Sequence, residues 1–396
     1  MIHRAILPGG KGGPGRVRPD ARIRVLQIMP QLGCGGAERQ LLGLVDRLDR
    51  ARFEVSVCSY SPMADSLEGA FRATGVRLIL LDKFSMPLWR FPLELRRIIR
   101  ASDPQVVHTW LPSAIFWGRW AAVSCGVRHI IANHRSETME ERWAAHVTER
   151  LLARRTVQVA NSEAGARALE KHYGLPRSRT RVIRNAVSVP TCDVQAARAE
   201  IRGEWGLPPD HHLVVMVARQ HAGKNYPMFL RTARNVCGQR DDVTFVGVGR
   251  SDLQDELRGL SADLGVGDRV RLVGQRSDVH RWLAAADVFC LTSIAEGYPN
   301  AVLEAMMASL PVVCTAFTSV SEVVRGPQFG VVVPQDDDEA MAREVGALLD
   351  DPARRARMGR AARTWAEAHH TWDELVGEVE SLYRELCGRR SFPEQR

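Results

Sequence analysis

Residues 294–310 read I-A-E-G-Y-P-N-A-V-L-E-A-M-M-A-S-L, and they follow an apolar run at 287–293. Such a run is typical of a buried strand. Gly297 and Pro299 then mark a turn, with Pro299 suited to the first position of a helix. From Ala301 onward, residues of high helix propensity predominate. The stretch therefore predicts a strand, a tight loop and a helix.

Two glutamates in this stretch are spaced to hold a ligand at two points. Glu296 falls in the loop and Glu304 in the helix, so helical rise would separate them by roughly 12 Å. Glycosidase carboxylates lie about 5–9.5 Å apart, which argues against that chemistry. The helix start between them offers free N–H groups to an anion. A cradle for a nucleotide-sugar fits this pattern; an ordinary turn with one capping and one solvated glutamate is the alternative.

Length and composition indicate a two-domain globular protein. The chain has 396 residues, which is too long for one ordinary hydrophobic core. Its residues are 45% hydrophobic and 25% charged. No apolar run reaches the length of about 18 residues that indicates a transmembrane helix. We expect residues 1–21 to be a disordered tail without a signal peptide, or to reflect an over-called start site. Eight scattered cysteines without a C-x-x-C pair favour a reducing cytosol over a zinc site or disulfides.

Charge is unevenly distributed along the chain. Residues 1–190 hold 30 Lys and Arg against 16 Asp and Glu, a balance of +14, and residues 191–396 hold 24 against 30, a balance of −6. A basic half indicates an anionic partner. Single arginines without a nucleic-acid-binding motif argue against nucleic acid, so we expect an anionic membrane surface or a phospholipid-linked acceptor. The expected location is the cytoplasm, including the inner face of the plasma membrane.

Strand-like and helix-like segments alternate throughout, which predicts parallel βαβ units in an α/β fold. The strand-like segments are 23–29, 55–60, 76–81, 106–109, 129–132 and 157–160, then 213–218, 243–248, 270–273, 288–291, 312–315 and 331–333. Pro190 and polar residues interrupt the pattern near 187–197, where we place the domain boundary.

Two loops in this pattern suit phosphate. Gly33, Gly35 and Gly36 follow the first strand, the usual phosphate position of a doubly wound sheet, although the spacing is not that of a dinucleotide site. Arg219 and Lys224 follow the first strand of the second half, where two cations can neutralise a diphosphate without a metal. A plain tight turn and two solvated charges are the respective alternatives.

Taken together, these motifs resemble the retaining glycosyltransferases of family 4, which have the GT-B fold. The resemblance lies in E-x7-E at Glu296 and Glu304, in R-x4-K at Arg219 and Lys224, and in G-G-A-E-R at 35–39. It spans residues 23–386 and implies two Rossmann-like domains facing a cleft. The expected divisions are an acceptor-side domain at 22–190, a nucleotide-sugar domain at 191–365, and a helix at 366–388 that crosses back.

The resemblance also implies an activity: transfer of a sugar, with retention, from a UDP- or GDP-linked donor to a hydroxyl acceptor. The acceptor would be lipid-linked or a saccharide, in polysaccharide, lipopolysaccharide or glycolipid assembly, and no cofactor or metal is expected. Glu304 would hold the ribose, Glu296 the donor sugar, and Arg219 and Lys224 the diphosphate. Further donor contacts are expected from the backbone N–H groups of Gly297, Tyr298 and Asn300 and from Gly35 and Gly36 of the opposite domain.

The sequence departs from the family pattern at several positions. Ser309 stands where a glycine is common, and Thr318 and Ser319 replace a glycine pair before Glu322, which puts the shape of the sugar pocket in doubt. Relatives often have a histidine two residues after His108, where this chain has a tryptophan. We take His108, at a strand end, as the candidate for a polar contact near the reacting carbon; a structural histidine is the alternative.

Three questions stay open from the sequence. Residues 88–100 combine two aromatic residues with four arginines, which suits either a membrane-surface segment or an amphipathic helix on the sheet. A nucleotide-sugar epimerase of GT-B fold is a second function, against which R-x4-K with E-x7-E argues. A non-catalytic nucleotide-sugar-binding subunit is a third, and the intact charged residues argue against it.

Overall fold

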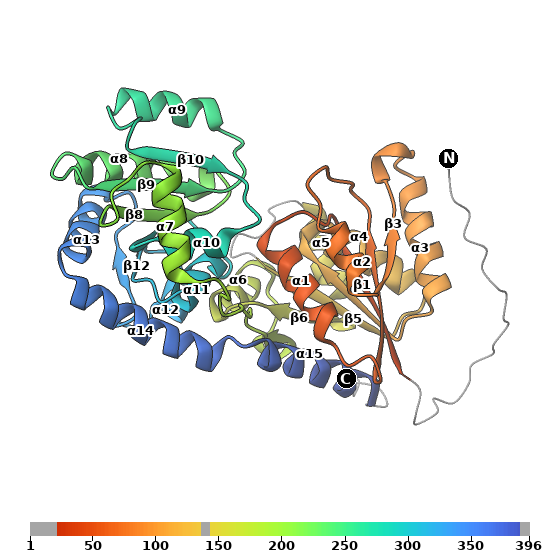
Figure 1. Ribbon diagram of the computed structural model, residues 1–396. Helices are drawn as coiled ribbons and strands as arrows, with labels where there is room; N and C mark the ends of the chain where they lie inside the picture. Colours follow the sequence, from red (N-terminus) through yellow and green to blue (C-terminus); the bar gives the residue numbers. More distant parts are fainter. Residues whose placement is uncertain (1–21, 136–142, 389–396) are drawn as a thin grey trace.

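The computed structural model describes residues 22–135 and 143–388, so the tail predicted at 1–21 lies outside the described residues. Two domains lie side by side, and a long pair of helices at the C-terminal end runs beneath both of them (Figure 1). Each domain is a parallel sheet flanked by helices, which confirms the predicted α/β architecture.

The first domain contains a seven-stranded sheet in the order β3-β2-β1-β4-β5-β6-β7. All its strand pairs are parallel. The strands are β1 (Ile23–Met29), β2 (Phe53–Ser59), β3 (Arg77–Leu80), β4 (Val106–Trp110), β5 (His129–His134), β6 (Thr156–Ala160) and β7 (Thr180–Val182). Their helices are α1 (Gly36–Arg47), α2 (Glu68–Ala73), α3 (Arg90–Ser102), α4 (Leu111–Ser124), α5 (Trp143–Leu152) and α6 (Glu163–Tyr173).

The second domain repeats this plan with a six-stranded parallel sheet in the order β10-β9-β8-β11-β12-β13. The strands are β8 (His212–Val217), β9 (Val243–Val248), β10 (Val270–Gly274), β11 (Val288–Leu291), β12 (Val312–Thr315) and β13 (Val331–Val333). The helices are α7 (Val194–Glu204), α8 (Tyr226–Cys237), α9 (Gln254–Asp263), α10 (Val279–Ala285), α11 (Asn300–Met307), α12 (Val320–Val323) and α13 (Asp338–Asp350).

Strand order reverses between β1 and β4 in the first sheet and between β8 and β11 in the second. Ligands of doubly wound sheets bind beyond the carboxyl ends of the strands at such a switch point. The loops that follow β1, β8 and β11 are the ones that carry the predicted motifs, so the topology gathers those motifs at the two switch points.

The chain crosses between the domains twice. The helix α14 (Pro352–His369) belongs to the second domain, and α15 (Trp372–Gly388) packs against α1 and β1 of the first. The break between them is at 370–371, so the crossing predicted from 366 begins a few residues later. His370 joins both crossings: its carbonyl accepts from the Val187 N–H at 3.1 Å, and its Nδ1 lies 3.0 Å from the Asn185 carbonyl.

Among the described residues, no helix is long and apolar enough to cross a membrane. All eight cysteines fall within the described ranges, and each is a free thiol.

Candidate functional site: the cleft between the domains

The Gly-rich loop of the first domain faces the start of α11 in the second. Gly35 is the N-cap of α1, and Gly36 is its first residue. A Cβ atom on Gly36 would lie 2.9 Å from the Asn300 amide nitrogen, so a side chain at this position would displace the Asn300 amide. Asn185, also from the first domain, donates from Nδ2 to the Asn300 Oδ1 at 2.5 Å. The Gly-rich loop of the first domain and the start of α11 in the second therefore meet at the junction between the domains, which we call the cleft.

Lys224 and Glu296 form an ion pair on the second-domain side of this cleft. Their side chains are 19% and 14% exposed, and the Ser293 hydroxyl donates to the same Glu296 oxygen at 2.7 Å. The R-x4-K lysine and the first E-x7-E glutamate, far apart in sequence, are thus adjacent in space. A cation and a carboxylate that stay partly exposed can both exchange partners when an anionic ligand enters.

Backbone contacts fix the loop after β11 to the loop after β8. The Ile294 N–H donates to the Gly223 carbonyl at 2.9 Å, and the Thr292 hydroxyl donates to the Lys224 carbonyl at 2.8 Å. On the other side, the Ser319 hydroxyl donates to the Glu296 carbonyl at 2.8 Å. Ser319 is one of the residues that replace the family's glycine pair, so this departure supplies a hydrogen bond that holds the Glu296 loop.

Arg219 does not join the pair of Lys224 and Glu296. Its guanidinium contacts Asp252 at 2.6 Å, and its side chain is 53% exposed. Both cations of R-x4-K follow β8, but only Lys224 is engaged with the E-x7-E stretch in this structure. The proposed role of Arg219 therefore requires it to exchange Asp252 for the ligand.

The side-chain carboxylate of Glu304 has no hydrogen bond or ion pair with any residue that the structure describes. It lies on α11, facing the first domain, and burial raises the pKa of its carboxyl above the usual range while Arg39 of α1 opposes that shift. Glu304 is partly buried, and a carboxylate that loses hydration without gaining a protein partner is costly unless something else satisfies it. Hydroxyl groups of a ligand would do so.

The backbone at the start of α11 corrects one prediction. The Asn300 N–H donates to the Tyr298 carbonyl at 3.0 Å, so it is not free for a phosphate here. The N–H groups of Gly297 and Tyr298 find no acceptor within the described ranges. The Tyr298 side chain is buried, and its hydroxyl lies 3.2 Å from His370 Nε2, so this side chain is held by the protein. Pro299 is the N-cap and not the first helical residue.

His108 lies in the core, contrary to our expectation of a contact near the reacting carbon. It is 1% exposed, its Nδ1 lies 2.8 Å from the Tyr383 hydroxyl, and its Nε2 accepts from the Asn133 amide at 3.2 Å. Tyr383 in turn accepts from Gln27 at 2.8 Å. Burial lowers the His108 pKa to about 3, with Arg135 adding to the shift, so the ring is neutral. Both ring nitrogens are occupied by protein, which leaves none for a substrate.

Arg135 is a cleft residue that the sequence analysis missed. Its guanidinium donates to the Asn185 Oδ1 at 2.6 Å and lies over the Trp110 ring at 5.2 Å. Burial lowers the Arg135 pKa to about 9, and Glu38 partly counters this. A single arginine after a strand gives no motif; only the fold shows that it lies beside the two asparagines that link the domains.

A second interdomain contact involves Glu322. Its carboxylate accepts from the N–H groups of Glu163 and Ala164, at 2.9 and 2.8 Å, and so caps α6 of the first domain. Carboxylates stabilise helix N-termini through these free N–H groups and the helix dipole. This contact and the one between Asn185 and Asn300 hold the two domains together at the cleft.

The acidic run 336–338 has structural partners. Asp337 caps α13, and Arg231 pairs with Asp336 and Asp338. Within residues 22–135 and 143–388, no group of three or more histidine, cysteine and acidic side chains is arranged to hold a metal ion.

Comparison with known families matches both domains. Residues 34–189 match the model described as Glycosyltransferase Family 4, and residues 197–365 match that of Glycosyl transferases group 1. The chain resembles the D-inositol 3-phosphate glycosyltransferase of Salinispora tropica, at 28% identity over 89% of this chain and 81% of the relative. It also resembles the UDP-Gal:alpha-D-GlcNAc-diphosphoundecaprenol alpha-1,3-galactosyltransferase of Escherichia coli, at 24% identity over 83% and 88% of the two chains.

Two solved structures share the fold. A glycosyltransferase from Rickettsia africae aligns with a TM-score of 0.81 at 16% identity, covering 93% of this chain and all of that one. HepE of Anabaena, in complex with UDP and glucose, aligns with a TM-score of 0.81 at 18% identity, covering 92% and 100%. The architecture is therefore that of the GT-B class. With the family matches on both domains, the chain is a glycosyltransferase.

Proposed function

We propose that this glycosyltransferase moves a sugar from a nucleotide diphosphate donor to a hydroxyl acceptor, with retention at the anomeric carbon. The observation that carries the proposal is the placement of the Glu304 carboxylate, which has no hydrogen bond or ion pair among the described residues, on the helix that follows the loop of Glu296, whose own carboxylate pairs with Lys224. Glu304 would accept hydrogen bonds from the ribose hydroxyls, and Glu296 from a hydroxyl of the donor sugar.

In the reaction, the bond between the anomeric carbon and the diphosphate oxygen breaks, and a bond to the acceptor oxygen forms. The acceptor proton passes to the departing phosphate, which gives a nucleoside diphosphate and a glycoside. Lys224, Arg219 and the N–H groups of Gly297 and Tyr298 would stabilise the charge on the leaving diphosphate. Front-side displacement guided by that phosphate accounts for retention without a covalent enzyme intermediate.

UDP is the better-supported nucleotide. The E. coli relative is named for a UDP-Gal donor, and the Anabaena structure contains UDP. The acceptor classes we propose are lipid-linked or saccharide, in polysaccharide, lipopolysaccharide or glycolipid assembly; the E. coli relative is named for a diphosphoundecaprenol-linked acceptor. We also propose that the protein acts in the cytoplasm, at the inner face of the plasma membrane.

The test is acceptor-dependent release of nucleoside diphosphate, with UDP- and GDP-sugars offered in turn to lipid-linked and saccharide acceptors. Release that needs both substrates, with an α-linked product from an α-linked donor, supports the proposal. Interconversion of the donor sugar without any acceptor identifies an epimerase instead. Donor binding without turnover on any acceptor identifies a binding subunit.

Metal removal gives a separate prediction. Because cationic side chains and backbone N–H groups are proposed to hold the diphosphate, we expect EDTA to leave the rate unchanged. Loss of activity on chelation that Mn²⁺ or Mg²⁺ restores would show that a metal ion does this work.

A further inference from the structure

The outer edge of the first domain carries exposed apolar side chains just before and along α3. Phe84 and Leu88 are each 75% exposed, Trp89 is 71% exposed, and Leu93 is 50% exposed. They lie in the turn after β3 and in the first turn of α3, at the end of the first domain that faces away from the second domain (Figure 1). Large apolar side chains gathered in one segment mark an interaction surface.

The opposite face of α3 packs into the core of the first domain. Phe91, Leu95 and Ile99 are buried, and Phe91 packs on Trp117 of α4 with ring centroids 5.6 Å apart. Side chains three and four residues apart share a helix face. The buried face therefore decides which residues of α3 point outward, and the outward set includes Leu93, Arg97 and Arg100.

Cations dominate the outward surface. Residues 83–102 contain five Lys and Arg against one acidic residue, a balance of +4. That residue, Glu94, is shared by Arg90 at 3.3 Å and Arg97 at 3.8 Å. Within the described parts of the chain, no carboxylate pairs with Arg96 or Arg100, and the buried Arg96 Nε has no hydrogen-bond partner.

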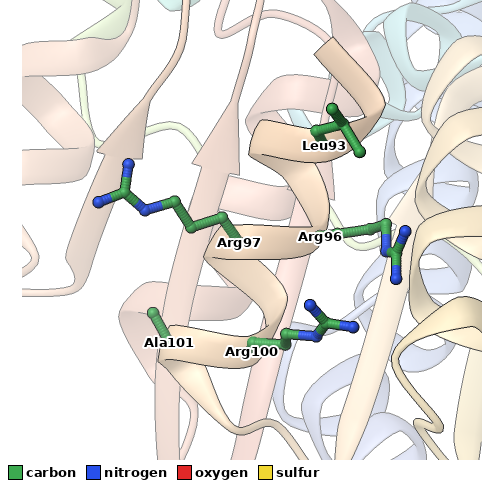
Figure 2. Close-up of a pocket in the computed structure, with 5 residues that line it drawn as sticks. All are labelled: Leu93, Arg96, Arg97, Arg100 and Ala101. Atoms are coloured by element: carbon green, nitrogen blue, oxygen red, sulfur yellow. The ribbon is translucent and has the colours of Figure 1, made fainter. Parts of the chain in front are cut away.

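Three arginines of α3 line a pocket of about 530 Å³ together with Leu93 and Ala101; they are Arg96, Arg97 and Arg100. Figure 2 shows the side chains of Arg96 and Arg100 extending to one side of α3 and that of Arg97 to the other. Guanidinium groups without carboxylate partners are well suited to phosphate oxygens, which they can bind in a bidentate way.

We propose that a surface formed by exposed apolar residues and arginines, which we call the α3 surface, docks on an anionic lipid bilayer. Its members are Phe84, Leu88, Trp89, Leu93, Arg96, Arg97 and Arg100. Exposed aromatic and aliphatic side chains enter the interface, while the arginines bind lipid phosphates, the combination that interfacial helices use. Exposed apolar groups of this size favour a bilayer over a nucleic acid, whose backbone offers charge alone.

The segment that leads into the α3 surface starts beside the carboxyl end of β2. The Lys83 N–H donates to the Tyr60 carbonyl at 3.0 Å, directly after β2, and the Tyr60 hydroxyl contacts Ser113 at 2.8 Å, at the start of α4. Docking there would hold the first domain at the membrane and leave the second domain free to move. Membrane binding by the α3 surface does not rest on the proposed function. Only the purpose of that binding, the delivery of a lipid-linked acceptor, rests on it.

The test is flotation of the full chain with phosphatidylcholine vesicles that contain or lack about 30% phosphatidylglycerol, at low and high salt. We expect binding to anionic vesicles that salt weakens. Arg96→Gln, Arg97→Gln and Arg100→Gln combined should weaken binding at least tenfold, since each basic residue near an anionic surface contributes roughly a factor of five. Leu88→Ser with Trp89→Ser should remove the binding that persists at high salt.

The matched control combines Arg343→Gln, Arg357→Gln and Arg360→Gln, three exposed arginines of α13 and α14 with the same loss of charge. This control and Lys224→Ala should bind vesicles like the unmodified protein, which separates membrane binding from sugar transfer. Far-UV circular dichroism confirms that each variant is folded. The proposal fails if neutral and anionic vesicles bind equally, if both arginine triples weaken binding equally, or if a DNA or RNA duplex displaces the vesicles.

Discussion

Two clusters of polar side chains, one at the interdomain cleft and one in the core of the first domain, differ in how many of their polar groups have protein partners. The cleft cluster is Lys224, Glu296 and Glu304; the core network is Gln27, His108, Asn133 and Tyr383. In the core network, His108 is 1% exposed and its two ring nitrogens have protein partners. In the cleft cluster, Glu304 lacks a partner among the described residues and the other two are partly exposed. In these two clusters, the Glu304 carboxylate is left free for a ligand, whereas both ring nitrogens of His108 have protein partners. In the core network, Asn133 Oδ1 has no hydrogen-bond partner among the described residues.

The largest effect is expected from the cleft cluster. Lys224→Ala removes a cation proposed to stabilise the leaving diphosphate, and charge-assisted hydrogen bonds contribute roughly 1.5–3 kcal/mol. Sugar transfer should therefore fall at least about tenfold. The thermal midpoint should change little, because the lysine is partly exposed. Lys171→Ala, an exposed lysine of α6, is the control and should keep full activity. Unchanged kinetics in Lys224→Ala would remove this residue from the site.

Substitutions of the two glutamates of the cleft cluster should change different kinetic constants. Glu304→Gln removes charge from a group assigned to the ribose, which is bound in ground and transition states alike, so KM for the donor should rise with little change in kcat. Glu296→Gln removes charge near the anomeric carbon, where positive charge develops, so kcat should fall.

Steady-state kinetics on both variants, with calorimetry of free nucleotide binding, separates these outcomes. Normal nucleotide binding in Glu304→Gln together with lost binding in Glu296→Gln would reverse the two assignments. No change in either variant would show that residues 294–310 are not the active-site cradle.

The core network should respond through stability and its dependence on pH. Burial lowers the His108 pKa to about 3, below its usual value near 6.5. Between these two pKa values the unfolded chain binds a proton at His108 that the folded chain does not. The free energy of unfolding is therefore unaffected by the titration of this group above about pH 6.5 and declines as the pH falls toward 3.

His108→Gln should lower the free energy of unfolding by about 1–3 kcal/mol at neutral pH and leave kcat and KM unchanged. It should also reduce the loss of stability between pH 7.5 and 5.5, to which a shifted histidine contributes about 1 kcal/mol. Urea denaturation of both proteins at the two pH values measures this. A variant that keeps its stability but loses activity would return His108 to the list of catalytic candidates.

The comparison also shows which features a sequence can predict. Largely apolar runs mark parallel strands, and β1, β9, β11, β12 and β13 have the predicted bounds. The loops after these strands could be located for the same reason. Pairings between distant residues could not: Tyr383 reaches His108 from a helix 275 residues away, and Glu322 caps α6 from the other domain. Whether a polar group is free depends on such distant partners. For this reason the prediction that His108 contacts the substrate near the reacting carbon was wrong.

The smallest effect is expected behind the cleft, at the end of α11, the helix that carries Glu304. Ser309 has a φ of 60°, in the left-handed region that costs an L-residue roughly 1–2 kcal/mol. The resemblance places a glycine here. Ser309→Gly should relieve this strain, offset in part by the greater freedom of glycine in the unfolded chain.

The net result should be a gain of about 0.5–1 kcal/mol, or a rise of roughly 1–3 °C in the thermal midpoint. No kinetic change is expected, because the substitution does not touch the cleft cluster. Gly359→Ala is the opposite control: its Cβ would lie 1.9 Å from the Ser309 carbonyl oxygen, so it should destabilise the same junction. A lower midpoint in Ser309→Gly would mean that the serine side chain stabilises this turn. A change in the donor KM would mean that the turn positions Glu304, and the cleft cluster would then extend to the far end of α11.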